Sequence, residues 1–522
     1  MVCICASQQR IVMEVETERT KPAAVFMAFG TKGDVYPIAA IAAAFACDQS
    51  QYDVVLITHS AHENLRCHLA EKHVSYLPIS SAPVVPIHQE HGSTEEPGSL
   101  EKIMFSAEHR QECCLAVETI FGSGPSMEGD FILINFFALE GWSIAELFRV
   151  RCIVAAPYVV PYSAPSSFER QFEKELPLLY KYLQEAHNTK VCWKDVIHWM
   201  WPLFSEYWGS WRCDDLNLSP CPFTDPVTGL PTWHDRPPSP LLLYGFSKEI
   251  VECPGYWPSN VRVCGFWFLP NEWQFSCKQC SELSRIVSSE RLYTKDEMCS
   301  AHVQLEYFLK TPVSMPPIFI GLSSIGSMGF LKNAQAFLRL LQTVLEITNY
   351  RFILFTAGYI PLDAAIRAVA AESSPYATHK QFNDECISLF NDRLFCFSGT
   401  VPYKWLFTRC AAAIHHGGSG TTAAALLAGI PQVVCPFVLD QFYWAERMFW
   451  LGVAPEPLKR THLLPEASGE KIAANFLSRA IQDALSPEIK EHAVEVSKRI
   501  SLEDGVSNAV KYIKEEIVGG SS

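Results

Sequence analysis

Short apolar runs, each followed by a turn and then by an amphipathic or Ala-rich segment, dominate the hydrophobic pattern of this chain. Residues 23–29 (AAVFMAF) form one such run, and residues 53–57 (DVVLI) form the next. Between them lie a Gly-containing turn at 30–34, Pro37 and the Ala-rich segment 38–47. Continuous apolar runs are typical of buried parallel strands, and Pro favours the first turn of a helix. The pattern therefore predicts a strand, a helix that begins at about Pro37, and a second parallel strand.

The same rhythm returns in the second half of the chain. Predicted strands there are 318–322, 351–355, 394–398, 411–415 and 432–437, and predicted helices are 330–347, 421–428 and 470–516. No period typical of solenoid repeats is present in either half. The chain is therefore expected to be an α/β protein built from two units.

The segment between these halves has a different composition. Residues 192–273 hold most of the Trp residues and much Pro. We interpret them as exposed loops that interrupt the first domain, although burial is the default for single Trp side chains. Residues 276–312 are polar and without strong periodicity, which favours a linker. The predicted division is a disordered tail at 1–22, domains at 23–275 and 313–495, a linker at 276–312, and a final segment at 496–522.

Composition narrows the function classes. The chain has 522 residues, 48% of them hydrophobic, and a net charge of −14. This composition excludes a wholly disordered chain and argues against a general polyanion binder, so no nucleic-acid partner is expected. The 19 Cys residues are irregularly spaced and no apolar leader opens the chain, so reduced thiols and a cytoplasmic location are expected. Cys277 and Cys280 form a lone C-x-x-C, which supports a zinc site only weakly.

Residues 415–422 (HHGGSGTT) carry the most specific chemistry in the sequence. They join the apolar run 411–415 to an Ala-rich helix. Glycines allow the backbone N–H groups to approach a ligand, and the start of a helix favours an anion. The next strand ends just before Asp440-Gln441, which can exchange hydrogen bonds with hydroxyl groups. Because both loops follow parallel strands, they open at the same sheet edge and predict a site for a sugar attached to phosphate.

The alternative is a tight turn whose glycines only reverse the chain. Asp440-Gln441 at the same edge makes that alternative less favourable. Neither the P-loop pattern G-x-x-x-x-G-K-[ST] nor the dinucleotide pattern G-x-G-x-x-G is present in the 415–422 loop.

The residues 415–458 (HHGGSGTTAAALLAGIPQVVCPFVLDQFYWAERMFWLGVAPEPL) and 29–45 (FGTKGDVYPIAAIAAAF) resemble the sterol glucosyltransferases of plants and fungi. Weaker similarity extends over most of residues 23–515. These enzymes are inverting nucleotide-sugar glycosyltransferases of the GT-B fold. The resemblance implies two facing Rossmann-like domains. The first would hold a lipophilic acceptor, the second would bind UDP-glucose, and the segment 496–522 would pack back on the first.

The resemblance also implies the roles of individual residues. Asp34 matches the proposed general base, although the loop alone favours a helix cap at this position. The implied donor-binding residues are Thr31, Lys32, Ser324, Val401, His415, Gly418, Ser419, Gly420, Thr421, Asp440 and Gln441. No D-x-D motif lies near them, so no metal ion and no cofactor besides the co-substrate UDP-glucose is expected. His59 is interpreted as structural, and Trp444 as core or a wall of the site.

Three departures from the family pattern bear on these expectations. Lys32 replaces the usual Arg, which keeps the charge but not the bidentate geometry. Residues 321–329 lack the usual Gly-Phe-Gly-Ser turn, and the acceptor stretch 156–168 lacks the usual Met-Pro-Trp pattern. A glucosyltransferase for a triterpenoid or phenolic acceptor and a non-catalytic GT-B binding module therefore stay open, as does peripheral contact with membranes.

Overall fold

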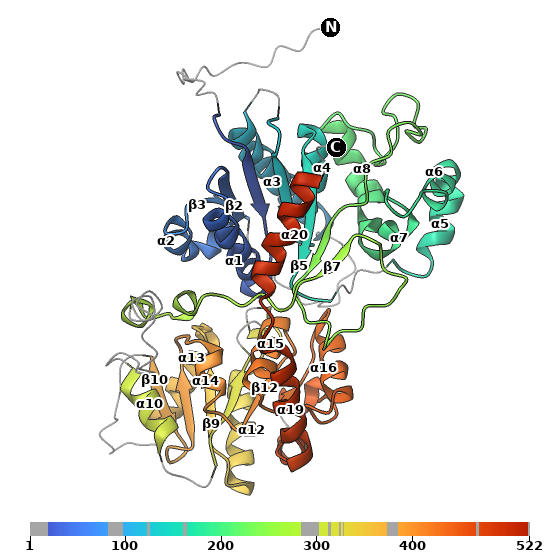
Figure 1. Ribbon diagram of the computed structural model, residues 1–522. Coiled ribbons are helices and arrows are strands. Elements are labelled where there is room, and N and C mark those ends of the chain that lie inside the picture. The colour runs from blue at the N-terminus through green and yellow to red at the C-terminus, as the bar shows by residue number, and fades with distance from the viewer. Residues whose placement is uncertain are drawn as a thin grey trace.

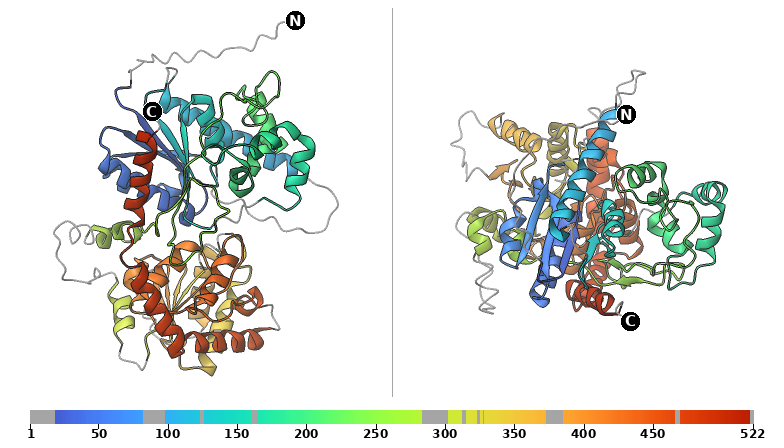
Figure 2. Two further views of the ribbon diagram at one scale, coloured as in Figure 1. Left: turned by 45° about the vertical axis from the view of Figure 1, so that its right-hand side comes forward. Right: turned by 90° about the horizontal axis from the view of Figure 1, so that it is seen from above.

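The computed structural model describes residues 19–81, 98–122, 126–159, 164–282, 302–311, 315–322, 325–326, 328–372, 385–465 and 469–519. Two lobes, each a sheet flanked by helices, lie one above the other (Figure 1), and a second direction shows the same separation (Figure 2). Ser324 and residues 1–18 of the predicted tail lie outside the described residues. Arg19, inside that predicted tail, forms an ion pair of 2.9 Å with Asp130, so the described part of the tail packs on the first lobe.

The sheet of the N-terminal lobe has seven strands in the order β3-β2-β1-β4-β5-β6-β7. All of its strand pairs are parallel. Its strands are β1 (Ala23–Met27), β2 (Asp53–His59), β3 (Val74–Ile79), β4 (Phe131–Ile134), β5 (Arg151–Ala156), β6 (Leu242–Tyr244) and β7 (Val261–Val263). The central strand β1 is buried along its whole length, as its apolar run predicts.

The sheet of the C-terminal lobe has six strands in the order β10-β11-β9-β8-β12-β13. Only β10 runs antiparallel to its neighbour among these pairs. Its strands are β8 (Ile318–Gly321), β9 (Phe352–Phe355), β10 (Cys386–Leu389), β11 (Leu394–Phe397), β12 (Ala412–His415) and β13 (Gln432–Val434). The five strands predicted in this half are confirmed, with ends that differ by one to three residues, and β10 is an additional one.

Helices cover both faces of each sheet. Those of the N-terminal lobe are α1 (Lys32–Asp48), α2 (Leu65–Ala70), α3 (Gly98–Phe121), α4 (Glu140–Phe148), α5 (Phe168–Glu175), α6 (Pro177–Gln184), α7 (Trp193–Asp195) and α8 (Glu206–Asp214). Those of the C-terminal lobe are α10 (Val303–Lys310), α12 (Ala334–Ile347), α13 (Ile360–Glu372), α14 (Tyr403–Phe407), α15 (Ser419–Ala428), α16 (Gln441–Trp450), α17 (Arg460–Leu463), α18 (Glu470–Ala484) and α19 (Pro487–Ile500). Among the described residues, no helix is both long and apolar enough to cross a bilayer.

Helix α1 begins earlier than its sequence pattern predicts. It starts at Lys32, so Pro37 lies inside the helix rather than at its first turn. Asp34 accepts hydrogen bonds from Thr31 and thereby starts the helix ahead of the proline. The missing N–H of Pro37 leaves only the carbonyl of Gly33 without its helical partner, and Gly33 is exposed to water. The early start brings Asp34 into the first turn.

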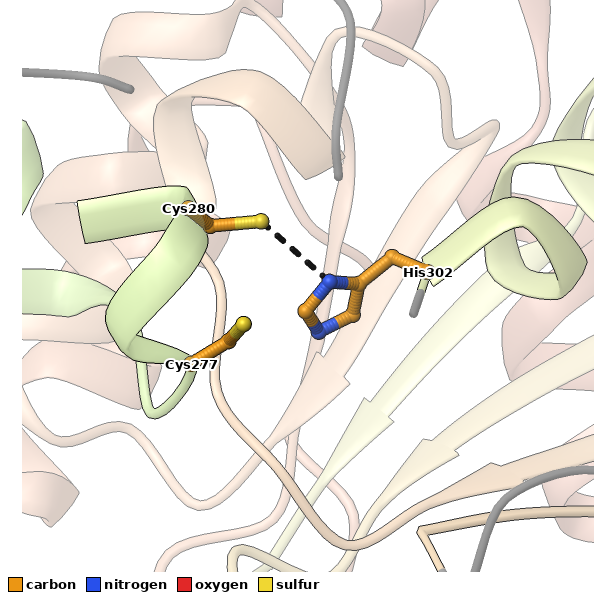
Figure 3. A group of neighbouring side chains, drawn as sticks. All are labelled: Cys277, Cys280 and His302. Atoms are coloured by element: carbon orange, nitrogen blue, oxygen red, sulfur yellow. Dashed lines mark hydrogen bonds between the residues drawn. The ribbon is translucent and has the colours of Figure 1, made fainter. Parts of the chain in front are cut away.

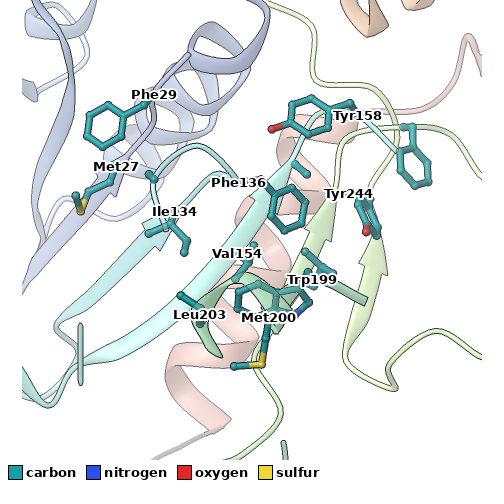
Figure 4. Packing of buried hydrophobic residues seen from close by; sticks show 14 of the residues in the cluster. Met27, Phe29, Ile134, Phe136, Val154, Tyr158, Trp199, Met200, Leu203 and Tyr244 are labelled. Carbon is teal, nitrogen blue, oxygen red and sulfur yellow. The ribbon is translucent and has the colours of Figure 1, made fainter. Parts of the chain in front are cut away.

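The Trp-rich middle segment is folded core at residues 193–214, which corrects the prediction of exposed loops there, whereas residues 226–230 and 233–235 are exposed loop as predicted. Its residues form α7, a π-helical turn at Val196–Met200, a 3-10 turn at Trp201–Phe204 and α8. Trp199 is 1% exposed and packs with Phe136 against the sheet (Figure 4). The aromatic rings supply the apolar area that the short elements themselves lack, so burial outweighs the many Pro residues.

The predicted C-terminal helix at 470–516 is three helices. Pro487 starts α19, and a further break precedes α20 (Gly505–Gly519). The predicted boundary at 495/496 falls inside α19. Helix α20 returns to the N-terminal lobe, where Ile513 joins the core around α1 (Figure 1). Lys514 Nζ donates to Asp48 Oδ2 over 2.7 Å at the end of α1.

The predicted linker at 276–312 is also corrected in part. Helix α10 lies within that range, yet Leu305 and Phe308 are buried in the core of the C-terminal lobe. The two lobes meet along α16, where Trp444 packs with Phe266 of the N-terminal lobe at a ring separation of 6.4 Å. Arg447 of α16 also forms an ion pair of 3.2 Å with Glu252. These contacts fix one lobe against the other beside the loop that carries Asp440.

Candidate active site

The candidate site residues follow the strands at which each sheet reverses its order. In the N-terminal lobe this point lies between β1 and β4, and in the C-terminal lobe it lies between β8 and β12. Ligands of open α/β sheets bind at the carboxyl ends of such strands. The loop of residues 30–34 follows β1, and the loop of residues 416–418 follows β12. The topology therefore supports the two loops that the sequence singles out.

Asp34 takes part in capping α1 and has a raised pKa. Its Oδ2 accepts hydrogen bonds of 2.7 Å from Thr31 N and from Thr31 Oγ1. Asp34 occupies the third position of α1 and Thr31 the N-cap position, so the cap that the loop alone favours is real but is shifted by one turn. Burial raises the pKa of Asp34 to about 6, although both hydrogen bonds from Thr31 lower it. The carboxylate is thus ionised and able to accept a proton near neutral pH.

Two histidines and an asparagine hold the loop in front of Asp34. His59 Nε2 accepts from Gly30 N over 3.1 Å, and His62 Nε2 donates to Gly30 O over 3.0 Å. Asn135, at the end of β4, donates to the carbonyls of Phe29 and Asp34. Gly30 has a φ of +106°, and a Cβ there would lie 2.7 Å from Asp34 Oδ2. His59 is structural, as predicted, whereas Asn135 is not predicted because a single polar residue after a strand gives no distinctive signal.

The loop after β12 leads into a helix whose first turn is open. Gly418 is the N-cap of α15, and no side chain caps this helix. The N–H groups of Ser419, Gly420 and Thr421 make up its first turn, and a Cβ at Gly420 would meet open space. The Thr421 hydroxyl hydrogen-bonds to Tyr403. The first N–H groups of a helix have no partner within it, so this uncapped start is a suitable place for a phosphate group.

His415 lies at the end of β12 but does not present a hydrogen-bond donor to the predicted diphosphate. It is fully buried, its Nε2 donates to Gln432 Oε1 over 2.8 Å, and its Nδ1 accepts from Gly417 N over 3.0 Å. Burial lowers the pKa of His415 to about 3, so the ring is neutral. The geometry assigns it to holding Gly417, which has a φ of +87° and whose Cβ would lie 3.0 Å from Gln441 O. His415 thus shapes the loop from behind.

Asp440 and Gln441 stand at the start of α16. Asp440 Oδ2 accepts from Trp444 Nε1 over 3.0 Å, which explains the burial of that indole. Gln441 Oε1 accepts from the backbone N–H groups of Phe437 and Val438, so its oxygen holds the preceding turn. Leu439, just before Asp440, has a φ of +53°, which is rare for a residue with a branched side chain. Such local strain is typical of functional loops.

Asp34 and Asp440 are brought near each other from opposite lobes. Burial, and then the charge of Asp34, raises the pKa of Asp440 to about 7, against the hydrogen bond from Trp444. A carboxyl whose pKa is raised by burial and by a second carboxylate is a frequent feature of active sites. Because the charge of Asp34 acts on Asp440, protonation of one carboxyl depends on the state of the other.

The remaining predicted donor residues lie around these loops. Lys32 is exposed at the first position of α1. Val401 is buried just after β11, beside Thr400, whose backbone N–H and carbonyl pair with Ser276. His416, next to the glycines, hydrogen-bonds to the backbone of Gly321 at the end of β8. His416 thus links the loop after β12 to the end of β8 at one edge of the sheet.

Comparison with known proteins identifies relatives along nearly the whole chain. The chain is 25% identical to sterol 3-beta-glucosyltransferase UGT80B1 of Arabidopsis thaliana over 92% of its own length and 66% of that protein. It is 25% identical to a sterol 3-beta-glucosyltransferase of Saccharomyces cerevisiae over 94% of its own length and 35% of that protein. It is 23% identical to UDP-sugar-dependent glycosyltransferase 52 of Dictyostelium discoideum over 93% of its own length and 26% of that protein. The chain thus spans between about a quarter and two thirds of these relatives.

A family model and solved structures agree with these relatives. Residues 393–485 match the C-terminal domain of erythromycin biosynthesis protein CIII-like proteins. The calicheamicin glycosyltransferase CalG4 superposes with a TM-score of 0.56 at 13% identity, over 96% of this chain and 99% of that one. A UDP-glucosyltransferase of Polygonum tinctorium superposes with a TM-score of 0.53 at 12% identity, over 97% of this chain and 100% of that one. The predicted GT-B fold and the predicted resemblance are confirmed.

Proposed function

The chain is a glycosyltransferase relative of the sterol 3-beta-glucosyltransferases, and from that premise we propose that it transfers glucose from UDP-glucose to a hydroxyl group of a sterol or a similar lipophilic alcohol. The observation that carries the proposal is that Asp34 of one lobe lies within electrostatic range of Asp440 of the other, in the lobe that also holds an uncapped helix start. A base, a group that holds hydroxyls and an anion site are the three parts that glucosyl transfer needs.

Asp34 is proposed as the general base. An alcohol is a weak nucleophile near neutral pH, and a carboxylate that takes its proton as the new bond forms accelerates the reaction about 10²- to 10⁴-fold. With a pKa of about 6, Asp34 is mostly ionised at pH 7 and still basic enough to accept the proton. Thr31 holds its Oδ2, so the proton would go to Oδ1. Direct displacement on the α-linked donor gives a β-glucoside.

The C-terminal lobe is proposed to hold the donor. Charge develops on the β-phosphate as UDP leaves, and the N–H groups at the start of α15 are preorganised for it. Asp440 accepts from glucose hydroxyls, and the amide of Gln441 adds a donor since its oxygen already binds the backbone. The backbone at Val401 is proposed to contact the uracil, and Thr31, Lys32 and Ser324 to complete the donor site. This electrostatic arrangement supplies the stabilisation without a catalytic metal ion.

The sterol part of the proposal rests on the names of the relatives in Arabidopsis thaliana and Saccharomyces cerevisiae. The altered acceptor stretch at 156–168 is the feature of this chain that favours a different lipophilic alcohol. Tyr158 of that stretch is buried in the N-terminal lobe beside Phe136 (Figure 4), and its ring also packs against that of Phe137.

Mass spectrometry of the products tests the proposal. Purified protein, UDP-glucose and a mixed pool of sterols and phenols are incubated together, and masses increased by one hexose are sought. A β-linked sterol glucoside is expected. Glucosides of the phenols alone would mean that the acceptor is a phenol rather than a sterol. The absence both of products and of UDP-glucose hydrolysis would favour the non-catalytic binding module.

A further inference from the structure

A cluster of three metal-ligating side chains lies where the chain passes from the first lobe to the second. Cys277, Cys280 and His302 place one ligand atom each within 4.8 Å of one another. Cys280 Sγ and His302 Nδ1 are 3.3 Å apart. Figure 3 shows both sulfur atoms directed toward the imidazole, with the cysteines on one segment and the histidine on another. The described residues hold no other such group of three.

The geometry fits a tetrahedral zinc site. Zinc lies about 2.3 Å from thiolate sulfur and about 2.0 Å from imidazole nitrogen, so adjacent ligand atoms are roughly 3.5 Å apart. The measured separation between Cys280 Sγ and His302 Nδ1 is close to that value. Cys280 and His302 are 3% and 0% exposed, so these two ligands are shielded from water, unlike those of a surface pair.

The charge of the surroundings also favours a cation. Glu385, which precedes β10, is close enough to His302 for the two charges to interact. His302 Nδ1 faces the thiol, and the ring packs edge-on against Phe397 at a centroid separation of 5.6 Å. Two thiolates balance the charge of Zn²⁺, and with one imidazole they supply three ligands. The fourth position is then open to water or a carboxylate.

We propose that Cys277, Cys280 and His302 bind one Zn²⁺ ion that ties the interlobe segment to the C-terminal lobe. Binding displaces the two thiol protons to solvent and creates two sulfur–zinc bonds and one nitrogen–zinc bond. Cys277 directly follows Ser276, whose backbone and hydroxyl pair with Thr400 next to Val401. The ion thus holds the segment that supports the loop after β11, and its role is structural.

Metal content and cysteine protection test this proposal on the full chain. Protein purified without chelator and then supplied with Zn²⁺ is expected to retain about one zinc per chain after desalting, by elemental mass spectrometry. Cys280→Ser is expected to lower the zinc affinity at least about 100-fold. Cys213→Ser, at an exposed cysteine on α8, is the matched control and should retain the ion.

Alkylation of the unmodified chain provides a readout that does not depend on a variant folding. The half-buried Cys277 should be protected with Zn²⁺ and become reactive after chelation, while the exposed Cys213 reacts in both states. Chelation should also lower the melting temperature of the unmodified chain but not that of Cys280→Ser. Zinc retention unchanged by Cys280→Ser, no zinc after loading, or a Cys277–Cys280 disulfide in the purified protein would each overturn the proposal.

Discussion

The helix starts of α1 and α15 are built alike and are chemically opposite. Each follows a buried central strand and a glycine with positive φ, Gly30 in one lobe and Gly417 in the other. They differ at the third helical position, which is Asp34 in α1 and Thr421 in α15. The aspartate closes its own helix start by accepting from Thr31. Since threonine supplies no such charge, the donors of α15 stay available to an anion.

Under the proposed function, this difference would let the same strand–turn–helix unit supply the two halves of the reaction. A carboxylate at the third position interacts with the positive end of its own helix and is held in place by the N-cap residue. Without it, the same dipole is directed outward at a ligand. In the proposed mechanism, the residue at this one position would decide whether a strand–turn–helix unit provides a proton acceptor or an anion site.

Replacing Asp34 with Asn should have the largest effect, because it removes the proton acceptor while keeping an oxygen for Thr31. We expect kcat to fall about 10²- to 10⁴-fold. UDP affinity, measured by calorimetry, should be unchanged. Asp48→Asn, at the exposed end of the same helix, is the control and should retain full activity. A kcat of Asp34→Asn within twofold of the unmodified enzyme would remove Asp34 from the mechanism.

Thr421→Asp tests the comparison directly, since it gives α15 the residue that α1 has at the same position. A carboxylate at the helix start would repel the diphosphate by about 1–3 kcal/mol, so UDP should bind roughly 10- to 100-fold more weakly. Thr421→Asn has a similar shape without the charge and loses the same hydroxyl contact with Tyr403. Equal UDP affinities of the two variants would mean that the α15 helix start does not hold the phosphates.

Much of this arrangement could be predicted from the sequence, because apolar runs and glycine turns are local signals. The strands beside the site, β1, β8 and β12, follow from their buried runs. The roles of His415 and Gln441 could not be predicted in the same way. Whether a polar side chain faces a ligand or its own backbone depends on neighbours such as Gln432, which is 17 residues away from His415.

Neither the early start of α1 nor the approach of His302 to the two cysteines could be predicted from the sequence, for a related reason. Pro37 favours a helix start at its own position, and only the contact between Asp34 and Thr31 overrides it. The C-x-x-C of Cys277 and Cys280 lacks a second half in sequence, and the fold brings in His302 from 22 residues away. Pairs set by tertiary structure carry no periodic signal.

The smallest expected effect concerns the hydroxyl that Thr31 donates to Asp34. This hydrogen bond lowers the pKa of Asp34, so Thr31→Val should raise that pKa above its value of about 6. Protonated Asp34 cannot act as a base. As the pH is lowered, the variant should therefore lose activity at a higher pH than the unmodified enzyme does. We expect kcat/KM to be about three- to fivefold below the unmodified enzyme at pH 6 and nearly equal to it at pH 8. Thr31→Ser keeps the hydroxyl and should follow the unmodified profile. A Thr31→Val defect of the same size at both pH values would instead assign Thr31 to donor binding and separate the α1 helix start from the proton transfer.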